Sequence, residues 1–310
     1  MSVVRGLVAA AVLSLGHGAS AQVTNSTMAI ADAFVCTGSA NYESGADLTG
    51  LNFGGAGALA VAPASSAKGE FQSVIGFNLS NSVAVFDSVC GSRNWRVTGM
   101  ALELSSNYGV AGVQPNNPLF NVISGGQFVI EWLADAAWVE GTGTPNLPTT
   151  DGISYSGLPV LLAQAREALC TNTYAPPGNN VHVTWPLPLT TNLVGGVRGG
   201  GDVNFRFYAA DQQVGYLFNS HSYGRGNEPL MVVTAAEKPP VILWGGFTNG
   251  VFRLSGIGGA GLEYQVQTNS SLGTTNWQAM GTAAADGSGR IQFDDGTATS
   301  GRQRFYRLAR

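Results

Sequence analysis

Apolar and polar residues alternate along several short stretches of this chain, most clearly in residues 68–79. A period of two is typical of a β-strand that buries one face against a core and turns the other away from it. The side that we expect to be buried consists of Phe71, Ser73, Ile75, Phe77 and Leu79. Residues 203–209 alternate in the same way. These stretches predict a sheet that covers a hydrophobic core.

The composition also favours many short strands joined by turns. The chain has 310 residues and 43 glycines, and helical periodicity is clear only in residues 160–170. A short helix or turn is expected at residues 83–90, and a flexible hairpin at the glycine-rich residues 195–201. Strands are expected at residues 27–36, 59–62, 68–79, 95–104, 125–133, 153–155, 181–186, 203–209 and 229–234. The predicted fold class is all-β, a jelly-roll or β-sandwich domain followed by a small fibronectin-like β domain.

Two segments, one at each end of the chain, differ from the main domain. Residues 1–21 have the features of a secretory signal peptide: Arg5, an apolar run over residues 7–15 and a box of small residues at 19–21. Paired prolines in residues 237–240 indicate a linker. The expected domains are therefore 22–236, the large sandwich, and 241–310, the small one.

The signal peptide predicts a secreted or cell-surface protein. Its apolar run is shorter than the roughly 18 residues that a membrane-spanning helix needs, and no other stretch is long enough to span a bilayer, so we expect no transmembrane segment after cleavage. The 15 basic and 19 acidic residues give a net charge of −4 and form no basic run. This excludes nucleic acid as an expected partner, because phosphate binding needs clustered lysine and arginine.

Three cysteines, Cys36, Cys90 and Cys170, follow the signal peptide. Export permits disulfide bonds, but an odd number leaves one thiol unpaired. Three pairings are possible, and the spacing does not choose among them. None of the three cysteines has the spacing of metal ligands.

The stretch 132–158 is the strongest candidate for a binding site, because a long loop rich in glycine, threonine and proline separates two expected strands. Aromatic rings can stack on sugars, and the alternative is that these rings belong to the core or anchor the loop. The residues expected to bind carbohydrate are Trp132, Trp138, Glu140, Tyr155 and Trp185.

Carboxylates in the same region allow two further interpretations. Glu140 and Asp151 could form the acid pair of a glycosidase, or they could accept hydrogen bonds from the loop and its Asp-Gly turn. A structural calcium ion is a second possibility, because carboxylates near loop carbonyls suit extracellular calcium. Its candidate ligands are Asp32, Glu43 and Asp47.

Several motifs resemble a known family. They are residues 32–35 (DAFV), 71–77 (FQSVIGF), 138–143 (WVEGTG), 151–155 (DGISY) and 225–234 (RGNEPLMVVT). Together they resemble the DNRLRE-type secreted bacterial β-sandwich modules, which are related to a carbohydrate-binding module family. Tyr264, Trp277 and residues 304–307 resemble a small C-terminal β domain of exported Verrucomicrobia-like proteins. The resemblance implies a bacterial protein with an extracellular role.

These observations favour a non-catalytic secreted protein that binds or scaffolds extracellular polysaccharide. Two alternatives stay open. The first is a structural cell-surface or matrix protein without a small-ligand site, and the second is a polysaccharide lyase or hydrolase that uses Glu140 or Asp151.

Overall fold

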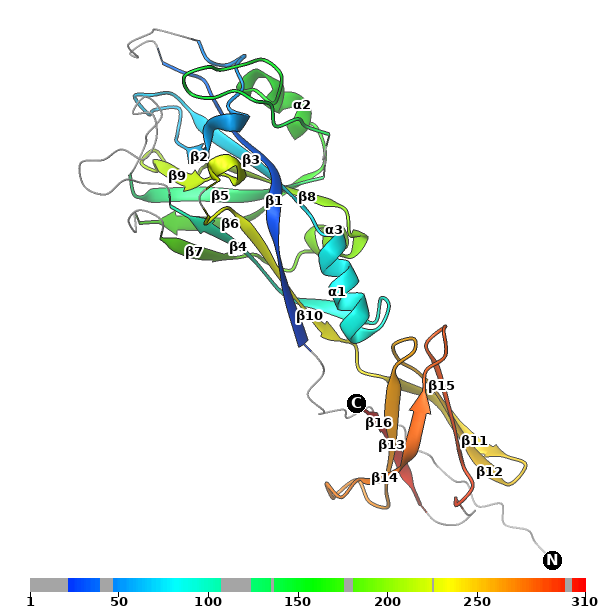
Figure 1. Ribbon diagram of the computed structural model, residues 1–310. Helices are drawn as coiled ribbons and strands as arrows, with labels where there is room; N and C mark the ends of the chain where they lie inside the picture. Colours follow the sequence, from blue (N-terminus) through cyan, green and yellow to red (C-terminus); the bar gives the residue numbers. More distant parts are fainter. Residues whose placement is uncertain are drawn as a thin grey trace, which may run out of the picture. The chain divides into compact units, whose positions relative to one another are not determined.

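A computed structural model shows two compact units (Figure 1). It describes residues 22–39, 47–106, 124–134, 137–175, 181–224, 226–298 and 303–310. The sandwich unit comprises Thr24–Val83 and Val97–Thr234. The C-terminal unit is built mainly of Ala84–Arg96 and Ala235–Arg310. The signal peptide expected at residues 1–21 lies outside the described residues.

The sandwich unit is an eight-stranded jelly roll. Its strands are β1 (Gln22–Cys36), β3 (Phe71–Asn78), β4 (Trp95–Ser105), β5 (Gly126–Leu133), β6 (Arg166–Tyr174), β7 (His182–Pro186), β8 (Asp202–Ala209) and β10 (Leu230–Glu237). Their order in the sheet is β6-β5-β8-β3-β1-β10-β4-β7. It contains two four-stranded halves, β1-β10-β4-β7 and β3-β8-β5-β6, which is the jelly-roll arrangement. The all-β prediction is therefore confirmed.

The two halves enclose an aromatic core. The ring of Phe128 in β5 meets the ring of Trp185 in β7 edge-on, with 5.2 Å between centroids. Phe128 also contacts Phe207 of β8 and Phe218 of β9 (Tyr216–Asn219). Edge-to-face contacts of this kind add to the stabilisation that burying the rings provides.

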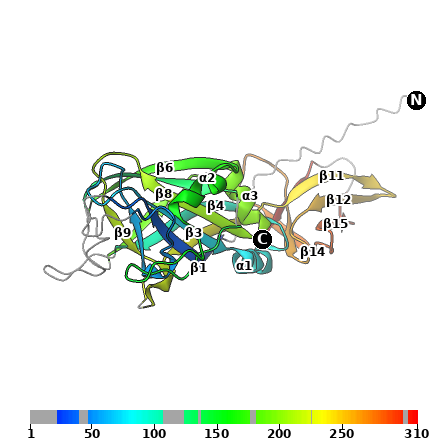
Figure 2. The same ribbon diagram turned by 90° about the horizontal axis from the view of Figure 1, so that it is seen from above.

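Strand β3 is buried on both faces, whereas its alternating sequence predicts one buried face. The difference arises from the short helix α2 (Leu158–Leu162), which covers the side of the sheet away from the aromatic core. Leu158 and Leu161 of this helix pack with Val74 of β3 and Leu133 of β5. Figure 2 views the same helix and strands from above.

One expected helix is present, and three other expected elements differ in the structure. Helix α1 (Ser80–Cys90) confirms the helix expected at residues 83–90. The helix expected over residues 160–170 is wrong, because it ends at Leu162 and residues 166–170 pair with β5 as the start of β6. The hairpin expected at residues 195–201 is wrong, since most of it belongs to α3 (Thr191–Gly199). The strand expected at residues 153–155 is also absent, because Tyr155–Gly157 forms the 3₁₀ turn η2.

Short elements close one side of the sandwich next to β1. Strand β2 (Ala58–Val61) pairs with β9 in a separate two-stranded sheet. The 3₁₀ turn η1 (Gly54–Ala56) precedes β2, and η3 (His221–Tyr223) follows β9. The hydroxyl of Ser222 joins the two turns by accepting from the Gly57 amide and donating to the Gly54 carbonyl. This places the start of η3 beside β1.

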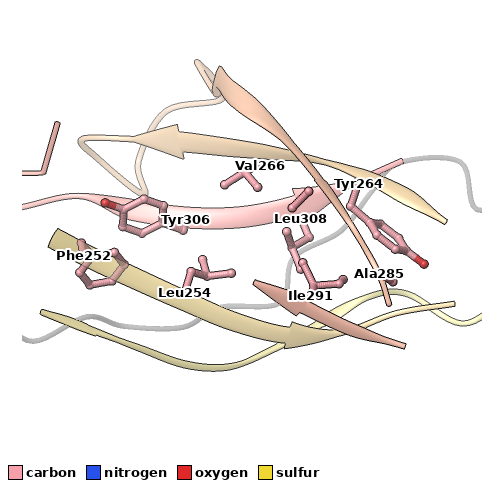
Figure 3. Close-up of a cluster of buried hydrophobic side chains, with 9 residues drawn as sticks. Phe252, Leu254, Tyr264, Val266, Ala285, Ile291, Tyr306 and Leu308 are labelled. Atoms are coloured by element: carbon pink, nitrogen blue, oxygen red, sulfur yellow. The ribbon is translucent and has the colours of Figure 1, made fainter. Parts of the chain in front are cut away.

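The C-terminal unit contains two three-stranded sheets, β11-β12-β15 and β14-β13-β16. The strands are β11 (Val241–Thr248), β12 (Val251–Ile257), β13 (Glu263–Asn269), β14 (Gln278–Ala284), β15 (Arg290–Asp295) and β16 (Phe305–Ala309). Figure 3 shows the core between them, where Phe252 stacks on Tyr306 with 4.7 Å between ring centroids. This is the small sandwich that the sequence predicts.

Two further findings concern the helices and the cysteines. Among the described residues, no helix has both the length and the apolar character to cross a membrane. Cys36, Cys90 and Cys170 are all free thiols, and the first two are buried.

Candidate functional site

The first candidate site lies at the point along β1 where the pairing of β1 with β10 ends. The Ala29 amide donates to the carbonyl of Pro229, one residue before β10 starts. The pairing of β1 with β3 shifts register between Ala29 and Ala31. Just beyond, the amide of Asp32 donates to Oε1 of Glu140 at 3.3 Å. A carboxylate from the loop after β5 thus takes the place of a neighbouring strand.

The loop that carries Glu140 is held by the buried side chain of Asn52. Its Nδ2 donates to the carbonyl oxygens of Glu140 (2.6 Å) and Ile153 (2.8 Å). Its Oδ1 accepts from the amides of Gly54 and Gly143, both at 3.1 Å. The amide group therefore uses its full hydrogen-bonding capacity to join both ends of the loop to η1.

Asp151 organises the far part of the same loop. Its carboxylate accepts from the hydroxyl of Thr149 and from the amide and hydroxyl of Thr142. These bonds, first of all that from Thr149, lower the pKa of Asp151 to about 2. Asp151 thus holds the loop together by accepting hydrogen bonds. This is the structural alternative to a role as a glycosidase acid.

His221 reaches the site from η3. Its backbone amide donates to Oδ2 of Asp32 at 2.7 Å. Its ring Nδ1 lies 3.0 Å from Glu140 Oε1 and 3.5 Å from Asp32 Oδ1. Asp32, Glu140 and His221 therefore meet from three segments that are far apart in the sequence.

The buried side of this cluster is not saturated with hydrogen bonds. Asp32 is fully buried, whereas the side chains of Glu140 and His221 are 23 % and 28 % exposed. Oδ1 of Asp32 has no hydrogen-bond partner in the described part of the chain, and Nδ1 of His221 makes no aligned hydrogen bond despite its short distance to Glu140. A buried carboxylate oxygen without a hydrogen bond is costly, so Oδ1 needs a cation beside it, either the protonated His221 ring 3.5 Å away or a bound ion.

Electrostatics within the cluster follow from this geometry. Burial raises the pKa of Asp32, and its contacts with His221 offset part of that rise. Pairing first with Asp32 and then with Glu140 raises the pKa of His221 to about 10. The imidazole is therefore protonated at neutral pH.

The donor set is that of a transition metal rather than of calcium. Two carboxylates and one imidazole suit zinc and related ions, whereas calcium takes oxygen ligands. Among the described residues, this is the one group of three or more such side chains that could hold an ion. Asp47 is not part of it, because its exposed carboxylate accepts from the amide and hydroxyl of Thr49. Glu43 lies outside the described residues, so a calcium site that includes it stays a prediction.

A second group of polar side chains lies on the outer face, the side of β3, β8 and β5 that points away from the aromatic core. Arg206 of β8 donates to Glu131 of β5 at 2.9 Å and to Gln72 of β3 at 2.7 Å. Gln72 donates to Glu70, which also accepts from the hydroxyl of Tyr155 at 2.6 Å. A continuous chain of hydrogen bonds thus crosses three strands.

Aromatic rings border this chain of hydrogen bonds. The guanidinium of Arg206 lies over the ring of Tyr208, 4.3 Å from its centroid. Trp138 packs with the apolar cluster beneath α2, and its indole N–H donates to Oδ1 of Asn204 at 3.0 Å. Tyr155, Tyr208 and Trp138 are each partly exposed. The outer face therefore combines flat rings with planar polar groups.

The structure does not bring all the predicted sugar-binding residues together. Trp138 and Tyr155 both lie at the outer face. Trp132 follows Glu131 in β5 and so faces the opposite side of the strand, near α3. Trp185 is buried in the aromatic core against Phe128. Glu140 belongs to the cluster with Asp32 and His221.

Sequence reasoning missed two contributors to these sites. His221 is a lone histidine in a polar loop, and its contact with Asp32 joins residues 189 positions apart. Arg206 stands in the strand pattern of residues 203–209, where an arginine between apolar residues is the signal that could have marked it. A charged residue that faces a covered sheet needs a partner.

Comparisons with known proteins add little to this geometry. No protein-family model matches the chain, and no curated protein does. A β-glucuronidase from Ruminococcus gnavus is 8 % identical over 98 % of this chain and 46 % of its own, with a TM-score of 0.19. A β-1,2-glucanase from Parabacteroides distasonis is 8 % identical over 77 % and 31 %, with a TM-score of 0.17. The chain thus spans less than half the length of either structure.

Proposed function

We propose that this protein is a secreted, non-catalytic β-sandwich protein that binds extracellular polysaccharide through the outer face. The observation that supports the proposal is the set of partly exposed rings that border the hydrogen-bonded chain from Glu131 through Arg206, Gln72 and Glu70 to Tyr155. Within this chain Glu131 and Gln72 are buried and hold their partly exposed neighbours in place. The resemblance to DNRLRE-type modules favours the same function.

This combination suits a sugar because a pyranose presents both apolar and polar surface. Its C–H groups can stack on rings such as Tyr208 and Trp138. Its hydroxyls can exchange hydrogen bonds with planar groups such as those of Arg206 and Glu70. Arg206 and Tyr208 stand on the paired strand β8, and Glu70 and Trp138 are hydrogen-bonded to strand residues, so these groups are already ordered before a ligand arrives, which lowers the entropic cost of binding.

The charge of the outer face bears on which polysaccharide it selects. Arg206 pairs with Glu131, and Arg166 lies 4.0 Å from the same carboxylate. With Glu70, the two positive and two negative side chains balance. The proposal therefore extends to neutral as well as acidic polysaccharides.

The test is binding of the purified protein to a panel of neutral and acidic polysaccharides, measured by affinity electrophoresis and calorimetry. We expect at least one polymer to bind, and we expect Tyr208→Ala and Trp138→Ala to weaken it about tenfold, a loss of about 1.4 kcal/mol. Trp277→Ala is the matched control, because this partly exposed tryptophan lies in the C-terminal unit.

Three outcomes would contradict the proposal. Absence of binding to every polymer would leave a structural surface protein as the better interpretation. Equal weakening by Trp277→Ala would remove the outer face as the site. Shortening of a polymer during incubation, followed by size-exclusion chromatography, would show a lyase or hydrolase instead.

A further inference from the structure

We propose that Asp32, Glu140 and His221 bind one divalent transition metal ion of the zinc class. The ligand atoms are Oδ1 of Asp32, Oε1 of Glu140 and Nδ1 of His221. This site is separate from the outer face. The proposal of a metal site does not depend on the proposal of polysaccharide binding.

The spacing of the three atoms fits a single ion. Nδ1 of His221 lies 3.0 Å from Glu140 Oε1 and 3.5 Å from Asp32 Oδ1, and one ligand atom from each residue lies within 4.8 Å of the others. Two ligands at roughly 2.1 Å from a tetrahedral zinc ion are about 3.4 Å apart. Small side-chain adjustments therefore suffice to complete the coordination.

An independent feature points to a cation at the same place. Oδ1 of Asp32 is buried, faces the cluster and accepts no hydrogen bond within the described residues. Buried carboxylate oxygens are almost always hydrogen-bonded or bound to a metal, because leaving them unsatisfied is costly. The other oxygen of Asp32 is already occupied by the His221 amide, which orients Oδ1 toward the site.

The surroundings also resemble those of ligand shells in metal proteins. Hydrogen bonds from neighbouring side chains hold the segments that carry the ligands. Asn52 fixes the backbone of Glu140, and Ser222 holds η3 next to His221. Such supporting contacts order the ligands before the ion binds. Because Glu140 and His221 are partly exposed, solvent can supply a fourth ligand.

An ion here would join three distant segments: β1, the loop after β5 and η3. The Asp32–Glu140 and Asp32–His221 contacts span 108 and 189 positions of the chain. A cross-link between such distant positions restricts the unfolded chain strongly. The ion would therefore stabilise the loop that carries Trp138. The competing interpretation is that a proton on His221 serves as the only cation of the cluster.

The experiment measures ion binding by the full protein after treatment with a chelator. Zn²⁺, Co²⁺, Mn²⁺ and Ca²⁺ are each titrated by calorimetry, and melting is followed with and without each ion. We expect one equivalent of Zn²⁺ to bind and to raise the melting temperature, since a ligand of the folded state stabilises it. Co²⁺ should bind with the visible absorption of a four- or five-coordinate site.

Variants assign the site to its residues. His221→Gln and Glu140→Gln should weaken Zn²⁺ binding by roughly a hundredfold or more, because the loss of a group that merely supports a ligand already costs about 10–100-fold. His182→Gln is the matched control, because His182 also pairs with a carboxylate, Glu103, but lies on β7. It should bind Zn²⁺ as the unchanged protein does.

Several results would overturn the proposal. One is no binding of Zn²⁺, Co²⁺ or Mn²⁺ by the unchanged protein, which would leave the protonated imidazole as the cation. Another is selective binding of Ca²⁺. A third is Zn²⁺ binding that His182→Gln removes and His221→Gln retains. The first two are measured on the unchanged protein, so a variant that fails to fold does not obscure them.

Discussion

Two buried polar side chains, Asn52 and Asp32, differ in how much of their hydrogen-bonding capacity is used. Every hydrogen-bonding position of the Asn52 amide is occupied, whereas one oxygen of the Asp32 carboxylate is not. A fully satisfied buried amide rigidifies its surroundings, and an unsatisfied carboxylate calls for a ligand. The first therefore explains how the loop is held, and the second explains where an ion could bind.

Replacing Asn52 tests the role of this residue in the loop. Asn52→Ala leaves two carbonyls and two amides of the loop region without partners, so we expect the free energy of unfolding to fall by about 2–4 kcal/mol. Urea denaturation followed by fluorescence measures this change. Asn192→Ala is the control, because this exposed asparagine makes a hydrogen bond with Glu167 and should change stability by about 0.5 kcal/mol or less. Equal effects of the two substitutions would contradict the role.

At the scale of elements, the alternating strands could be predicted because their pattern is local. Phe205 and Phe207 face the core and Arg206 faces away, as a period of two requires. Residues 166–170 could not be predicted, because their strand depends on pairing with β5, which the local pattern does not contain. A short amphipathic pattern supports either element until the neighbouring strand decides.

The candidate sites show the same limit. The long loop marks Trp138 and Tyr155 in the sequence, and both lie at the outer face. The same loop marks Glu140, but its partners Asp32 and His221 come from β1 and η3. No sequence spacing relates these three residues. They meet because Asp32 lies where β1 no longer pairs with β10, and because the turn after β9 carries His221 to the same place.

Helix α3 forms although the glycines in its sequence predict a flexible hairpin. Thr190 caps its first turn by accepting from the Leu193 amide, and Gly200 ends it with a φ of +70°. These end signals outweigh the low helix propensity of Gly195 and Gly196 inside the helix. The boundaries of the helix are thus set by its caps rather than by its interior.

Replacing two glycines, one inside α3 and one at its C-terminal cap, by alanine should change the stability of the protein in opposite directions. Gly195 lies inside the helix with nothing within 4 Å of the added methyl group, so Gly195→Ala should stabilise the protein by about 0.5–1 kcal/mol. Gly200→Ala forces a left-handed conformation and places its methyl 3.3 Å from Val83, so it should destabilise by about 1–2 kcal/mol. Thermal and urea denaturation of both variants measure the difference. Changes of the same sign would show that α3 does not end as described.

At the scale of the whole molecule, each unit has its own core and its own buried charge network. In the C-terminal unit, Asp295 is 2 % exposed and accepts hydrogen bonds from Thr297, Tyr306 and Arg304. Burial acts to raise the pKa of Asp295, but these hydrogen bonds outweigh it and the net pKa lies below its ordinary value. The carboxylate therefore joins β15 to β16 most strongly while it is ionised.

This network predicts an acid sensitivity with a defined sign. A carboxyl group whose pKa is lowered by folding stabilises the protein above its unfolded pKa, about 3.9, and loses that contribution as pH falls through the folded value. Asp295→Asn should therefore lower the melting temperature at pH 6, and the difference from the unchanged protein should shrink as pH falls below about 4. Calorimetry from pH 6 to pH 2 follows both proteins.

The neighbouring carboxylate provides the control for this prediction. Asp294 pairs with Arg253 in two hydrogen bonds of 2.7 Å, but its side chain is 47 % exposed. Exposed pairs contribute little because water and salt screen them, so Asp294→Asn should change the melting temperature far less at pH 6. A difference between Asp295→Asn and the unchanged protein that stays constant down to pH 2 would show that packing, rather than the charge of Asp295, holds these strands together.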